Sequence, residues 1–407
     1  MASLAQAEIT EIRQAPVSLA SSATVPMIIG LGCLAFAAAV GFGSDNLSRF
    51  WHAYLLGTVF CTSLALGGLF FVLAHHLTGG RWGTPVRRLA ELAAGALTTS
   101  AVMFIPILVW VLSGGTELYP WVDRAMVAAD PILRGKSGYL DPQWFAIRTV
   151  LYFALWIWMS QSMLRSSVKQ DSSDPLTRAR NMQWRSGPMI LIFALTMNFA
   201  AFDWLMSLEP HWFSTMFGVY FFAGSFEGFL ALLIITANRL QDRGVLSQSI
   251  TEEQYHDIGK LMFAFIFFWG YIAFSQFMLI WYAAIPEETL WFDIRQQGPW
   301  VTWSLILLFG HLLIPFLGTM SRAVRRNRRL IGFWAMWMFV MHWVDLVYII
   351  CPQVDGPAVV PLPWLELVAT VGMLGVFYAT VLRSASGKWL LPVQDPRLPI
   401  ALSYHNH

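Results

Sequence analysis

The stretch FDWLMSLEPHWFSTMFGVYFFAGSFEGF, from Phe202 to Phe229, gives the clearest indication of how this chain folds. It joins the end of one long apolar run to most of the next, and Pro210 separates the two runs. Because proline does not continue a helix, the stretch predicts two membrane-crossing helices joined by a tight turn. Asp203 and Glu227 lie inside these apolar runs, where a charged group is costly.

The composition of the chain is typical of a polytopic membrane protein. Of its 407 residues, 57% are hydrophobic and only 12% are charged, whereas soluble proteins carry about 25% charged residues. The three cysteines are far apart and form no CxxC pair, which disfavours zinc and iron–sulfur ligation. The sequence has neither a GxGxxG nor a Walker motif, which disfavours nucleotide cofactors, and nothing in it indicates nucleic-acid binding.

Ten segments are long and apolar enough to span a membrane, which requires about 20 residues each. They predict an all-α integral membrane protein. The predicted spans are residues 24–44, 50–76, 88–113, 143–165, 187–208, 212–239, 256–284, 298–321, 329–351 and 364–384. Pro106 and Pro315 lie inside the third and eighth spans and predict local kinks.

Lys and Arg residues are distributed unevenly between the two sides of these spans. Twenty of the 26 lie in the N-terminal arm, in every second loop and in the C-terminal tail. The opposite loops hold five, and Arg148 lies within the fourth span. Because cytoplasmic loops are enriched in Lys and Arg, both termini are predicted to be cytoplasmic.

Two repeated patterns predict that spans two to five and six to nine form two four-helix units. The matches, at an offset of 161 for the first three, are Trp51 with Trp212, Gly57 with Gly218, Gly67 with Gly228, and Asp203–Pro210 with Asp345–Pro352. Such parallel repeats occur in transport proteins. Chance matching in so aromatic a sequence is the alternative. The predicted regions are an arm 1–23, a first span and loop 24–49, the units 50–211 and 212–352, a last span 353–385 and a tail 386–407.

Glu227 is the acid placed deepest in a predicted span. On a helix it shares a face with Tyr220 and Gly224, and Gly224 with Gly228 would let another helix approach closely. A carboxylic acid removed from water favours its protonated form, so Glu227 is predicted to take up and release protons. The alternative is a permanently protonated acid that donates one hydrogen bond between helices.

A second set of polar residues lies towards the predicted outer ends of the spans. Asp203 and Asp345 occupy matching places, and His342 lies three residues before Asp345, so these two are expected to form a hydrogen-bonded relay. His211 lies at the turn after Pro210, where a structural role in fixing helix ends is the alternative.

His311, in the middle of the eighth span, connects this outer set with an inner one. The inner set comprises His75, His76 and Glu91. The graded series suits two aqueous half-channels that meet near the membrane centre, provided that the helices pack accordingly.

These residues bear on two cofactor classes, haem and quinone. A membrane haem requires two facing histidines, and only His311 and His342 are central, which disfavours haem. The aromatic run FFWGYIAFSQFMLIWY, Phe267 to Tyr282, could instead line a flat slot for a quinone ring near His342 and Asp345, although aromatic residues that face lipid are the simpler interpretation.

Three motifs carry a family resemblance. They are the opening stretch, LMFAFIFFWGYIAFSQFMLIWYAAIPEETLWF (Leu261–Phe292) and HWVDLVYIICP (His342–Pro352). Together they closely resemble the F subunit of bacterial alternative complex III, a quinol:electron-acceptor oxidoreductase related through its membrane subunits to the NrfD/polysulfide-reductase type. The resemblance covers spans five to nine and implies two four-helix bundles flanked by spans one and ten.

The resemblance also implies a function and partners. The expected protein is a cofactor-free, non-redox subunit of a quinol:cytochrome c oxidoreductase in the bacterial inner membrane, with bound lipid. Haem and iron–sulfur clusters would reside on partners, namely a multihaem cytochrome c and an iron–sulfur protein beside an NrfD-like C subunit. The family's proton path would fall on Asp203, Glu227, His342 and Asp345, to which position adds His211 and His311. The alternatives are a subunit that itself binds quinone or menaquinone, a structural scaffold, and a stand-alone transporter.

Overall fold

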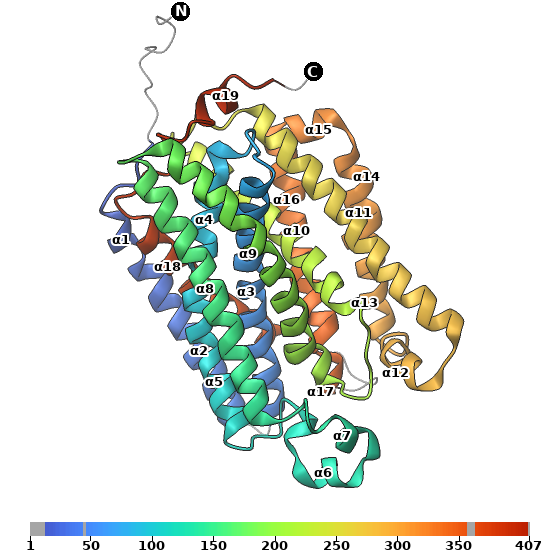
Figure 1. Ribbon diagram of the computed structural model, residues 1–407. Helices are drawn as coiled ribbons and strands as arrows, with labels where there is room; N and C mark the ends of the chain where they lie inside the picture. Colours follow the sequence, from blue (N-terminus) through green and yellow to red (C-terminus); the bar gives the residue numbers. More distant parts are fainter. Residues whose placement is uncertain (1–12, 44–45, 356–362, 406–407) are drawn as a thin grey trace, which may run out of the picture.

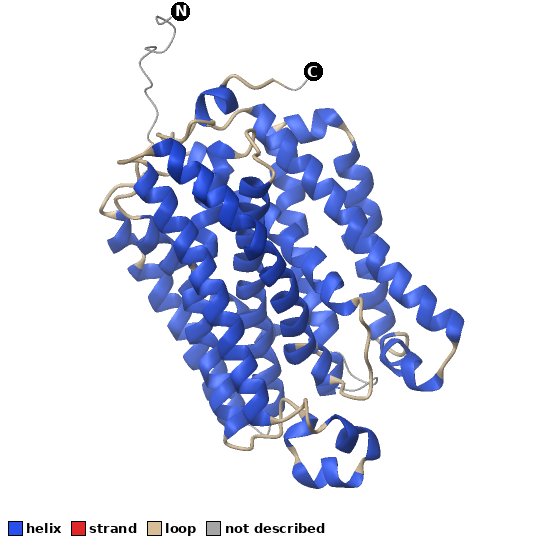
Figure 2. Cartoon of the chain, in the orientation of Figure 1, coloured by secondary structure: helices blue, strands red, loops and turns tan. Residues whose placement is uncertain are grey.

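The long apolar runs form long helices. The computed structural model describes residues 13–43, 46–355 and 363–405, and within these ranges the chain consists of helices and loops without a strand (Figure 2). Nine helical segments of the described residues are long and apolar enough to cross a membrane. Their bounds are Leu19–Gly43, Leu47–Leu77, Thr84–Leu112, Pro175–Leu208, Phe217–Gln241, Glu252–Ala283, Trp300–Met320, Arg328–Ile350 and Trp364–Ala385.

These segments and the helices between them are labelled in Figure 1. The helices are α1 (Leu19–Ser22), α2 (Thr24–Gly43), α3 (Leu47–Leu77), α4 (Thr84–Gly95), α5 (Leu97–Leu112), α6 (Arg124–Ala129), α7 (Pro131–Lys136), α8 (Pro142–Gln170), α9 (Pro175–Trp204), α10 (Phe217–Gln241), α11 (Glu252–Ala283), α12 (Pro286–Arg295), α13 (Trp300–Ile306), α14 (Ile314–Met320), α15 (Arg322–Arg326), α16 (Arg328–Ile350), α17 (Pro352–Asp355), α18 (Trp364–Ala385) and α19 (Leu398–Leu402). Short 3-10 turns cover Pro120–Val122 and Met206–Leu208, and a π-helical segment covers Leu307–Leu313.

The predicted fourth span is the helix α8, which is long but less apolar than the other nine segments. It contains Arg148 and Gln161 among several tryptophans, and it packs against α5 and α9. Its start is well defined, because the Asp141 side chain accepts hydrogen bonds from the backbone N–H groups of Gln143 and Trp144, with Pro142 at the first helical position. The count of ten spans therefore stays a prediction.

Several predicted boundaries differ from the structure. The loop between the fourth and fifth spans is much shorter than predicted. α8 continues to Gln170 and α9 begins at Pro175, so only residues 171–174 connect them. A helix satisfies its own backbone hydrogen bonds, so it can continue beyond the apolar stretch that predicted it. The sixth span begins at Phe217 instead of residue 212, and the third is interrupted at Ala96 and continues through Pro106.

The eighth span is irregular next to its proline. Residues Leu307–Leu313 are π-helical and lead directly into α14, whose second residue is Pro315. Proline lacks an N–H group and clashes with the carbonyl four residues earlier, here that of His311, so the widened turns accommodate it. This irregular segment places His311 in the interior of the protein.

The helices pack in two groups around a central pair. In one group α3 contacts α4, α5 and α9, while α8 contacts α4, α5 and α9. In the other, α10 contacts α11 and α16, and the π-helical segment contacts α11 and α16. α3 and α10 pack against each other, and α2 and α18 lie together beside α3 (Figure 1). The two predicted four-helix units and their origin by duplication both stay predictions.

The described ends of the chain lie on the same side of the helices. Gln14 pairs with Trp389 in an antiparallel bridge, and the Ala15 N–H donates to the Lys388 carbonyl at 2.9 Å. The first 12 residues of the predicted arm lie outside the described residues. In Figure 1, α15 and α19 are at this end, whereas α6, α7 and α12 are at the opposite end.

Candidate functional site

Glu227 and His311 form a fully buried pair between two helices. Glu227 lies on α10 and His311 on the π-helical segment, and each is 0% exposed. His311 Nε2 lies 3.2 Å from Oε2 of Glu227. No cationic side chain other than His311 is found in an ion pair with Glu227 among the described residues. The pair can therefore hold a proton on either partner without a change in its net charge.

Trp269 connects this pair to a second buried acid. Its ring, on α11, stacks on the His311 ring with centroids 3.8 Å apart and planes 3° from parallel. Its indole N–H donates to Asp345 Oδ2 at 3.3 Å, and the Tyr220 hydroxyl donates to Asp345 Oδ1. Asp345 lies on α16, so α10, α11, α16 and the π-helical segment all contribute side chains to this cluster.

Two glycines of α10 let α16 approach this cluster. A Cβ atom at Gly224 would lie 3.4 Å from both Asp345 Oδ2 and His342 Nδ1, and one at Gly228 would lie 2.6 Å from His342 Cδ2. The predicted close approach at Gly224 and Gly228 is thus made by His342 and Asp345.

The predicted hydrogen-bonded relay between His342 and Asp345 is not formed in the described structure. His342 Nε2 lies 2.8 Å from Oγ of Ser63 on α3, while Asp345 binds Tyr220 and Trp269. Both side chains face α10, but each finds its partner on a different neighbouring helix. His342 and Asp345 do lie on the same face of α16, as their spacing predicts. Their hydrogen-bond partners, however, come from other helices.

Three buried polar atoms of this cluster have no hydrogen-bond partner among the described residues. They are Glu227 Oε1, His311 Nδ1 and His342 Nδ1. Buried polar groups are normally paired, because leaving one unpaired costs about 1–3 kcal/mol. A carboxyl and two imidazoles with spare donor or acceptor capacity are suited to accepting and passing on protons.

Asp203 lies in a different environment from Glu227. Arg148 grips its carboxylate with two hydrogen bonds of 2.9 Å, and the Tyr152 hydroxyl donates to it at 2.8 Å. Both partners come from α8. A carboxylate held by a guanidinium and a phenol is balanced in charge, which favours a structural tie between α8 and α9. Asp203 and Asp345 match in the predicted repeat, but the side chains that surround them are of different kinds.

His211 also lies apart from the central cluster. It is partly exposed in the segment between α9 and α10, and its Nε2 lies 2.5 Å from Oδ2 of Asp130, the N-cap residue of α7. The hydrogen bond with His211 holds the pKa of Asp130 below its ordinary value. This contact ties the segment at α7 to the loop before α10.

The inner set of residues contains an ion-pair network that the sequence did not indicate. Arg87 binds both Glu91, at 3.1 Å, and Asp395 of the C-terminal segment, at 2.7 Å. The neighbouring His75 and His76 are buried, and their ring nitrogens have no hydrogen-bond partner among the described residues. The charge of Glu91 is thus balanced by an arginine. Of the predicted inner set, His75 and His76 are the residues without such a partner among the described residues.

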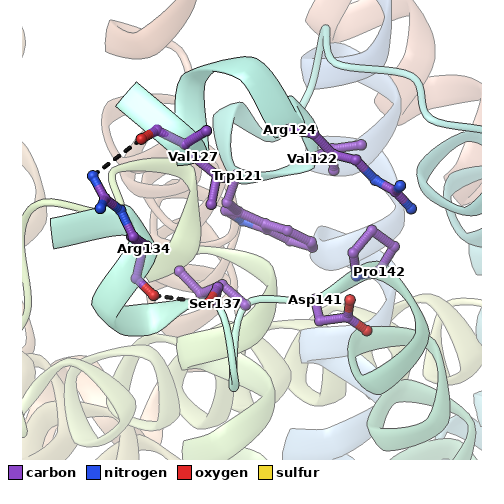
Figure 3. Close-up of a pocket in the computed structure, with 10 residues that line it drawn as sticks. Trp121, Val122, Arg124, Val127, Arg134, Ser137, Asp141 and Pro142 are labelled. Atoms are coloured by element: carbon purple, nitrogen blue, oxygen red, sulfur yellow. Dashed lines mark hydrogen bonds between the residues drawn. The ribbon is translucent and has the colours of Figure 1, made fainter. Parts of the chain in front are cut away.

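Two of the pockets at the end of the helices that carries α6, α7 and α12 bear on the site. One, of about 360 Å³, is lined by Tyr220 and Trp269, the two residues that bind Asp345, and by side chains of α11 and α12. The other, of about 450 Å³, lies in the segment of α6 and α7, where Figure 3 shows Trp121 between Arg124 and Arg134. None of the predicted site residues lines this second pocket.

Sequence reasoning missed the roles of Trp269, Ser63 and Arg148. Trp269 is one of 20 tryptophans, and Ser63 is a small polar residue of the kind that is common in helices. Only Arg148 carried a usable signal, because a cation inside an apolar span requires a buried partner. Comparison of the sequence with protein-family models finds no match, and comparison with curated proteins finds no significant similarity. The function must therefore be inferred from the residues of the chain itself.

Proposed function

We propose that this chain is a membrane subunit of a quinol-oxidising electron-transfer complex and that Glu227, His311 and Asp345 handle protons within it. The observation that carries the proposal is the fully buried contact between Glu227 and His311. The motif resemblance described above supports the choice of complex. Haem and iron–sulfur groups would then belong to partner subunits, and the complex would lie in the bacterial cytoplasmic membrane.

The energetic cost of the site supports a role in proton transfer. An ionisable residue in mid-bilayer costs at least about 2.5–3.5 kcal/mol, and such residues usually serve function. Asp203 and Glu366 are paired with arginines, whereas the ion-pair partner of Glu227 within the described part of the chain is a histidine, which is charged or neutral according to its proton. A proton can move between Glu227 and His311 over 3.2 Å without creating an unpaired charge.

The wider cluster supplies groups on both sides of this pair. Asp345, bound by Tyr220 and Trp269, lies towards the outer end of α16, and His342 leads to Ser63 on α3. His75 and His76 lie at the inner end of α3. In this proposal Asp203 and His211 have structural roles, because their partners fix helix and loop ends.

The substitution Glu227→Gln in the assembled complex tests the proposal. It keeps the size of the side chain and its ability to hydrogen-bond, but it removes the exchangeable proton. We expect turnover to fall roughly tenfold or more. If turnover persists, we expect fewer protons to be released per quinol oxidised than in the unsubstituted complex, down to those that the quinol itself must give up. Both quantities are measured in vesicles with a pH-sensitive dye.

The matched control is Glu366→Gln. Glu366 is also buried, but it is paired with Arg49 at 3.0 Å, so its substitution tests the general effect of changing a buried acid. Recovery of all partner subunits on purification shows that assembly is intact. Unchanged turnover and proton release in an intact Glu227→Gln complex would exclude the role proposed for Glu227 and favour a scaffold.

A further inference from the structure

The segment between α5 and α8 carries a pocket of about 450 Å³. α6 and α7, which form most of it, stand at the end of the molecule opposite to the described chain ends, on the side predicted to face outwards (Figure 1). Its walls combine apolar side chains such as Val122 and Val127 with two arginines, one serine and one aspartate. Ligand sites have volumes of about 300–1,000 Å³ and combine apolar walls with a few polar groups. The pocket thus has the size and the composition of a binding site.

The segment that forms this pocket is fixed to the membrane helices. The Tyr119 hydroxyl donates to the Trp204 carbonyl at 3.0 Å, and Nζ of Lys136 donates to the Pro210 carbonyl at 2.6 Å. Each of α6, α7 and α8 begins after an aspartate whose side chain accepts two backbone N–H groups of that helix. A segment held at so many points presents its pocket in a defined shape, and a preformed shape lowers the entropic cost of binding.

Two arginines give this pocket its charge. Arg124 and Arg134 line it, and the Trp121 ring lies between them (Figure 3). Both arginines are exposed, and within the described ranges neither guanidinium has a carboxylate at ion-pair distance. Arg134 donates from one terminal nitrogen to the Ala128 carbonyl at 3.1 Å, which leaves its other N–H groups to donate. A guanidinium presents a fork of donors that matches the two oxygens of a carboxylate.

The aspartates of the segment are engaged elsewhere. Asp123, Asp130 and Asp141 accept the backbone N–H groups at the helix starts, and Asp130 also binds His211. Of these three, only Asp141 lines the pocket. The charged lining groups are therefore two arginines and one aspartate, so their net charge is positive and favours an anionic ligand.

The apolar wall of the pocket has an unused donor. Trp121 is 3% exposed, and its indole N–H has no acceptor among the described residues. Buried indole N–H groups usually find a partner. An acceptor brought to this wall by a ligand would supply one.

We propose that this pocket binds an acidic segment of a partner protein, in which two carboxylate side chains flank an apolar one. The two arginines with a ring between them match two carboxylates, and the Trp121 ring matches the apolar side chain. The inference does not depend on the proposed function, because it concerns a site outside the membrane helices.

A small dicarboxylate shares the charges of such a segment, but it does not use the surface around the pocket. Met126 of α6 and Ile132 of α7 are 46% and 45% exposed. A protein partner covers apolar side chains of this kind and gains from removing them from water, whereas a small molecule leaves them exposed. The exposed side chains of α6 and α7 therefore favour a protein segment.

Fluorescence anisotropy with the purified full chain in a neutral detergent tests the proposal. The probe is the acetylated peptide Glu-Leu-Glu with a rhodamine label, and we expect saturable binding that is lost when both glutamates of the peptide are replaced by glutamine. The double substitution of Arg124→Gln with Arg134→Gln should weaken binding roughly tenfold or more, because it removes both guanidinium groups. Val127→Trp fills the pocket without changing its charge and should weaken binding to a similar extent.

The matched control is Ala125→Trp, which adds the same ring at an exposed position of α6 that does not line the pocket. It should bind the peptide as the unsubstituted protein does, and the melting temperature of each variant shows whether it is folded. The double arginine variant changes only exposed side chains, so it keeps the test decisive if Val127→Trp is unstable.

Three results would overturn the proposal. They are the absence of saturable binding, equal binding by folded Val127→Trp and Ala125→Trp, and displacement of the peptide by an equal concentration of succinate, which would assign the pocket to a small dicarboxylate. Glu227→Gln should bind the peptide unchanged, so failure of this site and failure of the proposed proton function are measured separately.

Discussion

Two buried acids of this protein differ in the partners that surround them. Asp203 accepts hydrogen bonds from Arg148 and Tyr152, so its carboxyl group lies next to a permanent cation. Glu227 has His311, whose charge depends on a proton. The first arrangement fixes two helices to each other. The second leaves the acid free to change its protonation state.

The structural role of Asp203 predicts the effect of removing its partner. The substitution Arg148→Met leaves a buried carboxylate without its cation, and we expect the free energy of unfolding to fall by about 3–5 kcal/mol. Replacing both residues, as Arg148→Met with Asp203→Leu, should restore most of this loss. Unfolding in mixed detergent micelles, followed by circular dichroism, measures both effects.

The control for this pair is Arg165→Met on the same helix. Arg165 is exposed, so its replacement should change the free energy of unfolding by less than about 0.5 kcal/mol. If Arg148→Met were as stable as this control, Asp203 would not depend on Arg148, and a proton-carrying role for Asp203 would return to consideration.

At the scale of helices, the glycine face of α10 determines how closely α16 approaches. His342 fills the space beside Gly228, and its imidazole is fixed there by Ser63. The Asn327 side chain caps the start of α16 by accepting from the backbone N–H groups of Arg329 and Leu330. Cap and glycine contacts together set the axial position of His342 and Asp345 relative to Glu227.

This packing predicts an unusual sensitivity to a single methyl group. In Gly228→Ala the new Cβ would lie 2.6 Å from the His342 ring, so the imidazole must move away from Ser63. We expect a loss of about 1–3 kcal/mol in the free energy of unfolding. Detergent-induced unfolding of the purified protein measures it.

Gly32→Ala on α2 is the matched control, because no atom lies within 4 Å of the added Cβ. Alanine favours a helix over glycine, so this variant should be unchanged or more stable by up to about 1 kcal/mol. Equal stabilities of the two variants would mean that α10 and α16 do not pack closely in the membrane.

At the scale of the whole molecule, charge and packing point to one arrangement in the membrane. The described ends of the chain, α15 and the turn between α8 and α9 lie at one end, and α6, α7 and α12 lie at the other (Figure 1). Arginines are concentrated at the first end, for example in α15. The positive-inside rule predicts that this end is cytoplasmic.

Cysteine labelling of intact cells checks this orientation. Gly138→Cys, beyond α7, should react with a membrane-impermeant maleimide from outside, because the residue is exposed and open space surrounds it. Ser173→Cys, in the turn between α8 and α9, should react only after the membrane is opened. The reverse pattern would invert the orientation. Native Cys61 and Cys351 are buried and should contribute little background.

Much of the fold could be predicted from the chain because membrane spans follow from local composition. Long apolar runs must form helices in lipid to satisfy their backbone groups, so nine of the predicted spans are present as suitable helices. Boundaries were less predictable. The polar extensions of α8 and α9 and the π-helical segment before Pro315 depend on capping and neighbouring helices, which hydropathy does not record.

Helical spacing along the chain is enough to show which costly polar residues share a helix face: Glu227 with Gly224, and His342 with Asp345. The partners of these residues depend on how the helices pack. The packing pairs Glu227 with His311, Asp345 with Tyr220 and Trp269, His342 with Ser63, and Asp203 with Arg148. The physical reason is that the helical period fixes directions along one helix, whereas contacts between residues far apart in the chain depend on how whole helices pack.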